Sequence, residues 1–190
     1  MKRDDMTALI LAGGKARRLG GVDKREIVVG GRTIFARQVE VLAPLVAEIL
    51  VSSPRPIAGY RTVVDAVPDA GPLAGIAAGL AAATTAWVFV LAGDMPHMHR
   101  AFVELLLSHA GTESDAVGIR IGGLPEPLCS VLRVAVWGPI VAARLSARRL
   151  KASSLLTDEP VRIRWIEEPT LRSIDPLLRA LHNVNAPEDL

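Results

Sequence analysis

Cysteine is nearly absent from this chain: Cys129 is the only one among 190 residues. This excludes an intramolecular disulfide and a CxxC zinc knuckle, and it argues against catalysis by a thiol. No apolar run approaches the ~18 residues needed to cross a bilayer. The first apolar stretch, in MKRDDMTALILAGG, follows two aspartates and is too short for a signal peptide. We therefore expect a soluble, cytoplasmic protein with no membrane partner.

A strong charge imbalance is also missing, since 22 Lys and Arg stand against 20 Asp and Glu, for a net charge of +2. That excess is too small to favour a nucleic-acid partner. Hydrophobic residues make up 50% of the chain, which is enough to bury one compact core. We expect residues 1–190 to form a single domain.

Short apolar runs alternate with helical patterns along the chain. Strands are predicted at 7–12, 49–52, 62–65, 87–92, 116–121, 128–134 and 161–166, with a brief extension at 27–29. Helices are predicted from a Thr33 cap to about Pro44, and at 73–83, 100–108 and 135–145. This order is typical of a doubly wound α/β fold, a mostly parallel, Rossmann-like sheet flanked by helices. Ligands of such sheets bind beyond the carboxyl ends of the strands, so the loops there are the candidate sites.

The loop after the first strand, LAGGKARRLGGVDK, contains four glycines and four cations in fourteen residues. Glycines let backbone N–H groups converge on an oxyanion, and Arg18 and Lys24 can neutralise a triphosphate. The loop has neither the Gly-Lys-Ser/Thr of a Walker A motif nor GxGxxG spacing. The alternative is that the glycine pairs form ordinary turns.

This loop resembles the LAGGxxxRLGGxDK motif of the MobA-like molybdenum cofactor guanylyltransferases, a family of nucleotidyltransferases. The resemblance implies GTP and molybdopterin, with or without molybdenum, as substrates. It also implies catalytic roles for Lys24 and Arg18, although the Arg25-Glu26 pair departs from the family pattern. The implied nucleotide-binding residues of the loop are Leu11, Ala12, Gly13, Gly14, Arg18, Gly20, Gly21 and Lys24.

Two later strand ends extend the resemblance. Ser52 stands where similar proteins often have asparagine, with an ordinary polar turn as the alternative. Asp65 can accept hydrogen bonds from guanine or ribose, and Gly71 belongs to a GPLAG segment that, with LAGG, is typical of guanine enzymes and not of related cytidylyltransferases. Gly75 and Gly79 lie four residues apart on the predicted helix 73–83 and should let this helix lie close to the sheet.

Asp94 follows the buried run 88–92 and is the candidate metal ligand. Mg²⁺ prefers oxygen ligands and keeps most of its waters, so one carboxylate and the triphosphate suffice. The alternative is that Asp94 caps the next helix. The family's D-x-P pattern favours Mg²⁺, with Mn²⁺ as a substitute, and gives Asp94 catalytic and nucleotide-binding roles. His97 and His99 lack a third zinc ligand nearby.

The C-terminal HNVNAPEDL resembles the family's NVNTPEDL ending. Strand alternation would place Asn183 and Asn185 on one face, where the resemblance implies acceptor binding; a turn that closes the domain is the alternative. Ala186 replaces the usual threonine and removes a capping hydroxyl. The segment 118–127, with Arg120 and Glu126, is expected to border the acceptor.

These motifs together imply transfer of GMP from GTP to the terminal phosphate of molybdopterin, with release of pyrophosphate. The alternatives are a cytidylyltransferase of the same pathway, an NTP transferase acting on a sugar phosphate or phospholactate, and a nucleotide-binding protein without turnover. Further partners would be cofactor-synthesis proteins and apo-molybdoenzymes.

Overall fold

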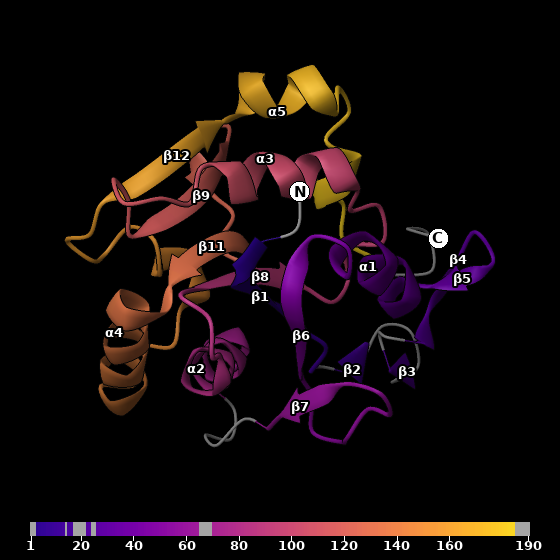
Figure 1. The fold of residues 1–190 in the computed structure, drawn as a ribbon, viewed down its shortest axis with the longest axis horizontal. Coiled ribbons are helices and arrows are strands. Elements are labelled where there is room, and N and C mark those ends of the chain that lie inside the picture. The colour runs from indigo at the N-terminus through magenta and orange to yellow at the C-terminus, as the bar shows by residue number, and fades with distance from the viewer. Residues whose placement is uncertain (1–2, 14, 17–21, 24–25, 65–69, 185–190) are drawn as a thin grey trace.

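A mixed, mostly parallel sheet forms the centre of the molecule (Figure 1). The structure, a computed structural model, describes residues 3–13, 15–16, 22–23, 26–64 and 70–184. The strand order is β10-β9-β11-β8-β1-β6-β7, with β12 paired to β9. The strands are β1 (Arg3–Leu11), β6 (Val46–Ser52), β7 (Arg61–Val63), β8 (Trp87–Ala92), β9 (Ala116–Ile121), β10 (Leu124–Pro125), β11 (Cys129–Arg133) and β12 (Ile163–Glu167).

The predicted α/β class is confirmed, with one antiparallel strand inside the sheet, β11, and another, β10, at the end of the strand order. Strands β7, β6, β1 and β8 run parallel, and β12 is parallel to β9. Strand β11 lies between β8 and β9 and is antiparallel to both. Two small hairpins lie outside the sheet: β2 (Lys15–Ala16) with β3 (Val22–Asp23), and β4 (Val28–Val29) with β5 (Arg32–Thr33).

Helices cover both faces of the sheet. One buried cluster packs the sheet against α1 (Ile34–Leu42), α3 (Arg100–Ser108) and α5 (Glu168–Ile174). The other packs it against α2 (Pro72–Ala82) and α4 (Val134–Ser146). Two 3-10 turns also occur: η3 (Ala152–Ser154) follows α4, and η4 (Arg179–Leu181) follows α5. Within the described ranges, no helix is long and apolar enough to span a membrane.

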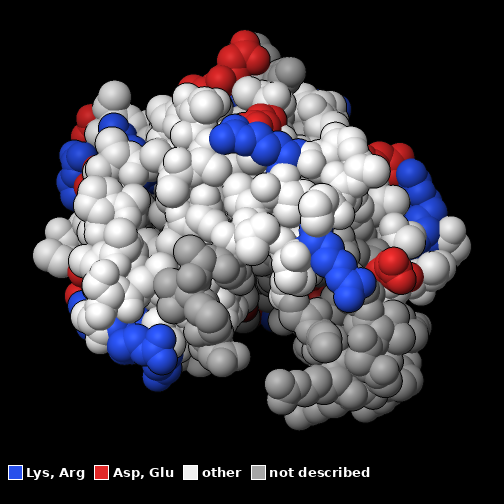
Figure 2. All heavy atoms as spheres, turned by 90° about the horizontal axis from the view of Figure 1, so that it is seen from below, with Lys and Arg blue, Asp and Glu red and all other residues white. Residues whose placement is uncertain are grey.

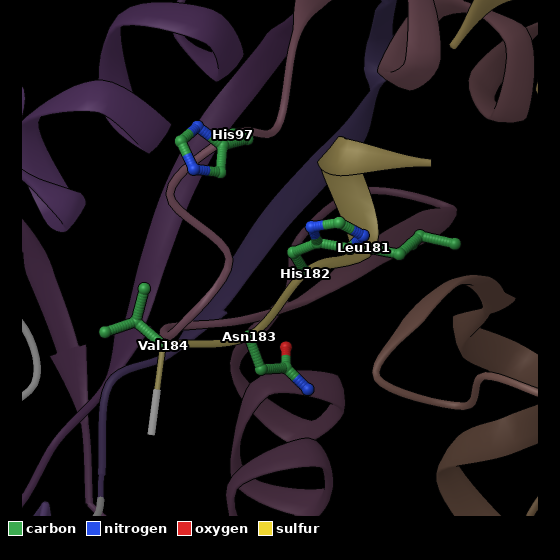
Figure 3. A pocket seen from close by; sticks show the side chains of 5 residues that line it. All are labelled: His97, Leu181, His182, Asn183 and Val184. Carbon is green, nitrogen blue, oxygen red and sulfur yellow. The ribbon is translucent and has the colours of Figure 1, made fainter. Parts of the chain in front are cut away.

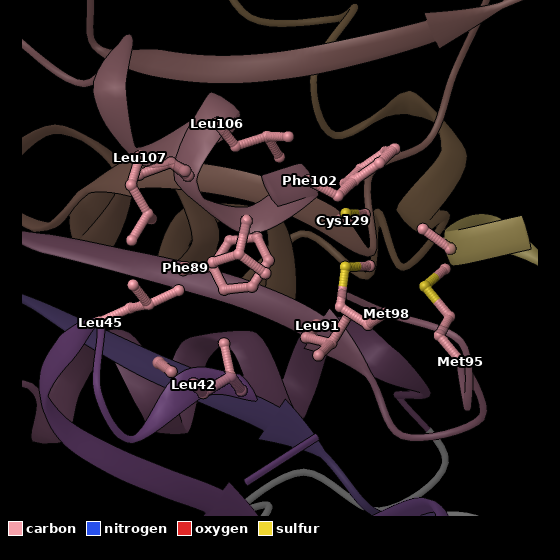
Figure 4. Packing of buried hydrophobic residues seen from close by; sticks show 14 of the residues in the cluster. Leu42, Leu45, Phe89, Leu91, Met95, Met98, Phe102, Leu106, Leu107 and Cys129 are labelled. Carbon is pink, nitrogen blue, oxygen red and sulfur yellow. The ribbon is translucent and has the colours of Figure 1, made fainter. Parts of the chain in front are cut away.

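The hydrophobic core explains which elements the sequence predicted well. Phe89 and Leu91 of β8 pack against Phe102 and Leu106 of α3, all fully buried (Figure 4). The predicted ranges 87–92, 100–108 and 116–121 match β8, α3 and β9, because each is an apolar pattern bounded by turn residues. The expectation that residues 1–190 form one domain stays a prediction.

Strands β1 and β6 begin earlier than predicted, because contacts between distant segments extend them over polar residues. The backbone N–H of Arg3 donates to the carbonyl of Leu45 at 2.8 Å, and its Nη1 donates to the carbonyl of Leu107 at 2.7 Å. Strand β6 accordingly starts at Val46, where it pairs with Arg3. The predicted Thr33 cap is confirmed, since its hydroxyl accepts the N–H of Ala36 at 3.1 Å.

Helix α2 lies close to the sheet through its glycines, as predicted. A Cβ on Gly75 would come within 2.6 Å of Ser52 Oγ and 3.0 Å of Leu11 Cδ2. One on Gly79 would overlap the buried side chain of Leu9. A larger residue at either position would push the helix away from the strand ends.

Candidate functional site

The carboxyl ends of β1, β6 and β8 are joined by backbone hydrogen bonds. The N–H of Ala12 donates to the carbonyl of Ser52 at 3.0 Å, and the N–H of Gly93 donates to the carbonyl of Leu11 at 3.1 Å. The strand register agrees, because Leu11 is paired with Ser52 on one side and Ala92 on the other. The structure therefore brings Leu11, Ala12 and Ser52 together with the loop that carries Asp94.

The start of α2 lines the same edge. Gly71 is the N-cap of this helix, at φ +62°, a conformation that favours glycine. Gly13 is exposed, whereas the Ser52 side chain is almost fully buried and lies against Gly75. Ser52 is thus placed to hold α2 at the strand ends, and its role in base binding stays a prediction.

The loop after β8 is held from α1. Gln38 is 1% exposed, and its Nε2 donates to the carbonyls of Ala92 at 2.8 Å and Met95 at 3.2 Å. These bonds fix the backbone on both sides of Asp94. Sequence reasoning missed Gln38, although a polar residue between Ile34 and Leu42 on the buried stripe of a helix was the available signal.

Asp94 does not cap the following helix. That helix begins at Arg100, and its N-cap is His99, whose Nδ1 accepts the N–H of Phe102. The Asp94 residue is half-buried at the end of β8. The capping alternative is therefore wrong, and the metal-binding role of Asp94 stays a prediction.

The C-terminal segment reaches the Asp94 loop directly. The N–H of Val184 donates to the carbonyl of Asp94 at 2.8 Å. Asn183 is exposed and lines a pocket of about 440 Å³ with His97, Leu181, His182 and Val184, called the acceptor pocket below. Figure 3 shows His97 on the loop after β8 and His182, Asn183 and Val184 on the C-terminal segment. The predicted strand is wrong for residues 182–184, which have no regular secondary structure.

Glu126 lies near Asp94, a proximity that the sequence did not reveal. Its N–H donates to the carbonyl of Ile119 at 3.1 Å, and its Oε1 accepts the N–H of Leu128 at 3.2 Å. Burial raises the pKa of the Glu126 carboxyl, and the negative charge of Asp94 raises it further. A cation at Asp94 would relieve this repulsion.

The donor set fits Mg²⁺ bound with a nucleotide. In the part of the chain that the structure describes, no three His, Cys, Asp or Glu residues gather into a metal cage. A hard cation that keeps its waters and binds phosphate oxygens needs only one or two carboxylates. Asp94 would be the direct ligand.

The described charges form no continuous basic surface on the face viewed in Figure 2. Lys and Arg side chains appear there as separate spots. Cys129 is fully buried in the core, and burial raises the pKa of its thiol, so it packs as a small apolar residue.

Seven predicted site residues lie outside the described residues: Gly14, Arg18, Gly20, Gly21, Lys24, Asp65 and Asn185.

Known proteins resemble this chain over nearly its whole length. A molybdenum cofactor guanylyltransferase of Pseudomonas putida strain F1 is 35% identical over 194 aligned residues, covering 99% of this chain and 97% of the relative. A probable molybdenum cofactor guanylyltransferase of Methanosarcina mazei is 31% identical, covering 100% and 90%.

Solved structures share the fold. The molybdopterin-guanine dinucleotide biosynthesis protein A of Archaeoglobus fulgidus superposes with a TM-score of 0.79 at 23% identity, over 97% of this chain and 94% of that protein. A 2-C-methyl-D-erythritol 4-phosphate cytidylyltransferase of Thermus thermophilus gives 0.71 at 20% identity, over 100% and 95%. The model of the MobA-like NTP transferase domain matches residues 8–162. The strand-end site described above therefore belongs to a member of the MobA-like NTP transferase family.

Proposed function

We propose that this protein transfers GMP from GTP to the terminal phosphate of molybdopterin, with or without bound molybdenum. A phosphate oxygen of the acceptor attacks the α-phosphorus of GTP in line. The new P–O bond replaces the bond between the α- and β-phosphates, and pyrophosphate leaves. No covalent enzyme intermediate is needed, so the protein contributes positioning and charge neutralisation.

The proposal of GTP and molybdopterin as substrates rests on the similarity to proteins named as guanylyltransferases. This similarity reaches 35% identity over 99% of this chain and 97% of the relative. The geometry supports the reaction type, because three strand ends, the start of α2 and the C-terminal segment converge where a parallel sheet binds ligands. A cytidylyltransferase or another NTP transferase would use the same geometry, and nucleotide preference separates them.

The nucleotide would bind along the end of β1 and the start of α2. Leu11, Ala12 and Gly13 would contact the base and sugar, with Ser52, Asp65 and Gly71 beside them. Arg18 and Lys24, with the backbone N–H groups of Gly14, Gly20 and Gly21, would neutralise the phosphates. Asn183 and Asn185 would hold the acceptor phosphate on the other side of Asp94.

Mg²⁺, or Mn²⁺ in its place, would bind at Asp94 and stabilise negative charge on the phosphate oxygens. Asp94 supplies one carboxylate oxygen, and Gln38 and Val184 fix the backbone that carries it. We place the reaction in the cytoplasm, where cofactor-synthesis proteins would deliver the acceptor and apo-molybdoenzymes would receive the product.

Calorimetric titration with GTP, CTP, ATP and UTP in the presence of Mg²⁺ tests the nucleotide preference. We expect selective GTP binding that weakens by about tenfold or more in Asp65→Ala, because a carboxylate accepting hydrogen bonds from guanine or ribose is lost. Asp69→Ala, four residues along the same segment, is the matched control and should bind as the wild type does. A preference for CTP would contradict GTP as the nucleotide substrate but keep the reaction type. Binding of no nucleotide would contradict the proposal altogether.

A further inference from the structure

A second pocket adjoins the acceptor pocket through His97. It has a volume of about 350 Å³ and lies between α1, the loop after β8, and the segment around η4. We call it the cationic groove; its lining residues are Arg37, Glu40, Val41, Pro96, His97, Met98, His99, Asp175 and Arg179. His97 also lines the acceptor pocket, so the two cavities are neighbours that share this residue.

The carboxylates of the groove are already engaged. Glu40 pairs with Arg32 at 2.5 Å. Asp175 accepts the N–H of Ala180 at 2.8 Å, and its Oδ2 lies 3.8 Å from Nε2 of His99. Asp175 also accepts a hydrogen bond from the backbone of Arg179, and among the described residues neither carboxylate forms an ion pair with the guanidinium of Arg37 or Arg179.

The two arginines of the groove, Arg37 and Arg179, place positive charge at the cavity. Nε of Arg37 donates to the carbonyl of Val29 at 3.3 Å, which orients the guanidinium. Among the described residues, neither Arg37 nor Arg179 forms an ion pair within 4.0 Å. Burial lowers the pKa of His97, and Arg37, His182 and Arg179 lower it further, against an opposing effect of Asp175. The groups that lower the pKa of His97 thus come from two segments, α1 and the segment around η4.

The groove is tied to the Asp94 loop by hydrogen bonds. Gln38, next to Arg37 on α1, donates to the carbonyls of Ala92 and Met95. The carbonyl of Asp94 accepts the N–H of Val184 from the segment that follows Arg179. The arginines are therefore held on the same framework as the proposed reaction centre.

We propose that the cationic groove is a second anion-binding subsite, which holds a multiply charged oxyanion beside the acceptor pocket. This inference rests on the proposed function. The oxyanion has two potential sources: the metal-oxo end of the acceptor, remote from its reacting phosphate, and the pyrophosphate that the reaction releases. Guanidinium groups suit either source, because they donate paired hydrogen bonds to oxyanions.

The test is calorimetric titration with molybdate and, separately, with pyrophosphate, both without Mg²⁺. The double variant Arg37→Gln/Arg179→Gln should weaken binding of at least one oxyanion by about tenfold or more, since charge-assisted hydrogen bonds are lost. The double variant Arg37→Lys/Arg179→Lys should retain part of the affinity, because it keeps the charge. The control, Arg149→Gln, removes an arginine paired with Asp158 and Glu159 and should bind as the wild type does.

The oxyanion that the Arg37→Gln/Arg179→Gln variant binds more weakly identifies the source. A loss confined to molybdate assigns the groove to the acceptor's metal end, and a loss confined to pyrophosphate assigns it to the product. Unchanged affinity for both overturns the inference. Titration of the same samples with GTP and Mg²⁺ separates this inference from the proposed function. If the variants bind GTP as the wild type does and their affinity for both oxyanions is unchanged, only the role of the cationic groove is contradicted. Equal thermal midpoints for all variants ensure that folded proteins are compared.

Discussion

Asp94→Asn is expected to lower turnover by about a thousandfold while the protein keeps its fold, because the variant loses only a negative charge at the proposed metal site. The side chain keeps its size, and the hydrogen bonds that fix this loop involve the backbone of residue 94 and the carbonyls of Ala92 and Met95. Steady-state pyrophosphate release measures the loss. The Mg²⁺ concentration that gives half-maximal rate should rise in parallel.

Asp158→Asn is the matched control, because it neutralises an exposed carboxylate that pairs with Arg149. We expect its turnover to equal that of the wild type. If Asp94→Asn is fully active and its Mg²⁺ requirement is unchanged, Asp94 is not a metal ligand.

Gly93→Ala is expected to damage stability and turnover together. A Cβ at this position would lie 2.6 Å from the carbonyl oxygen of Leu11 and 3.3 Å from Cα of Ala12. Both atoms belong to the backbone at the end of β1, so they cannot move aside as a flexible side chain could. We expect the free energy of unfolding to fall by about 1–3 kcal/mol, as for other overpacked cores.

The same displacement would move the adjacent Asp94 away from the end of β1. A misplacement of about 1 Å can cost on the order of a hundredfold in rate. Denaturant unfolding and pyrophosphate release on the same variant measure the two effects. Gly111→Ala is the control, because no atom lies within 4 Å of the added Cβ. Wild-type stability and turnover in Gly93→Ala would show that this close approach does not position the loop.

The sequence predicted the elements whose burial is set by local patterns. Strand β8 and helix α3 are apolar runs with turn residues at both ends, and their bounds were predicted correctly. The glycines of α2 were correctly expected to allow close packing, since a Cβ on either would overlap side chains of β1 or β6. Asp94 was predicted as a site residue from its place after a buried strand and from the family resemblance, and this role stays a prediction.

Features that depend on contacts between distant segments could not be predicted in this way. The direction of β11 follows from its pairing with β8 and β9, and an apolar run carries no such information. Gln38 acts on the Asp94 loop from more than fifty residues away in the chain. Asn183 lies in irregular structure beside Val184, which bonds to Asp94, whereas the alternation of this segment is typical of a strand.

Product analysis by mass spectrometry tests the central claim most directly. Purified protein is incubated with molybdopterin, Mg²⁺ and each of the four nucleoside triphosphates, and both the dinucleotide product and pyrophosphate are quantified. We predict a guanine dinucleotide and an equal amount of pyrophosphate with GTP, and little product with CTP, ATP or UTP. A cytosine dinucleotide as the main product, or no dinucleotide from any of the four, would contradict guanylyl transfer.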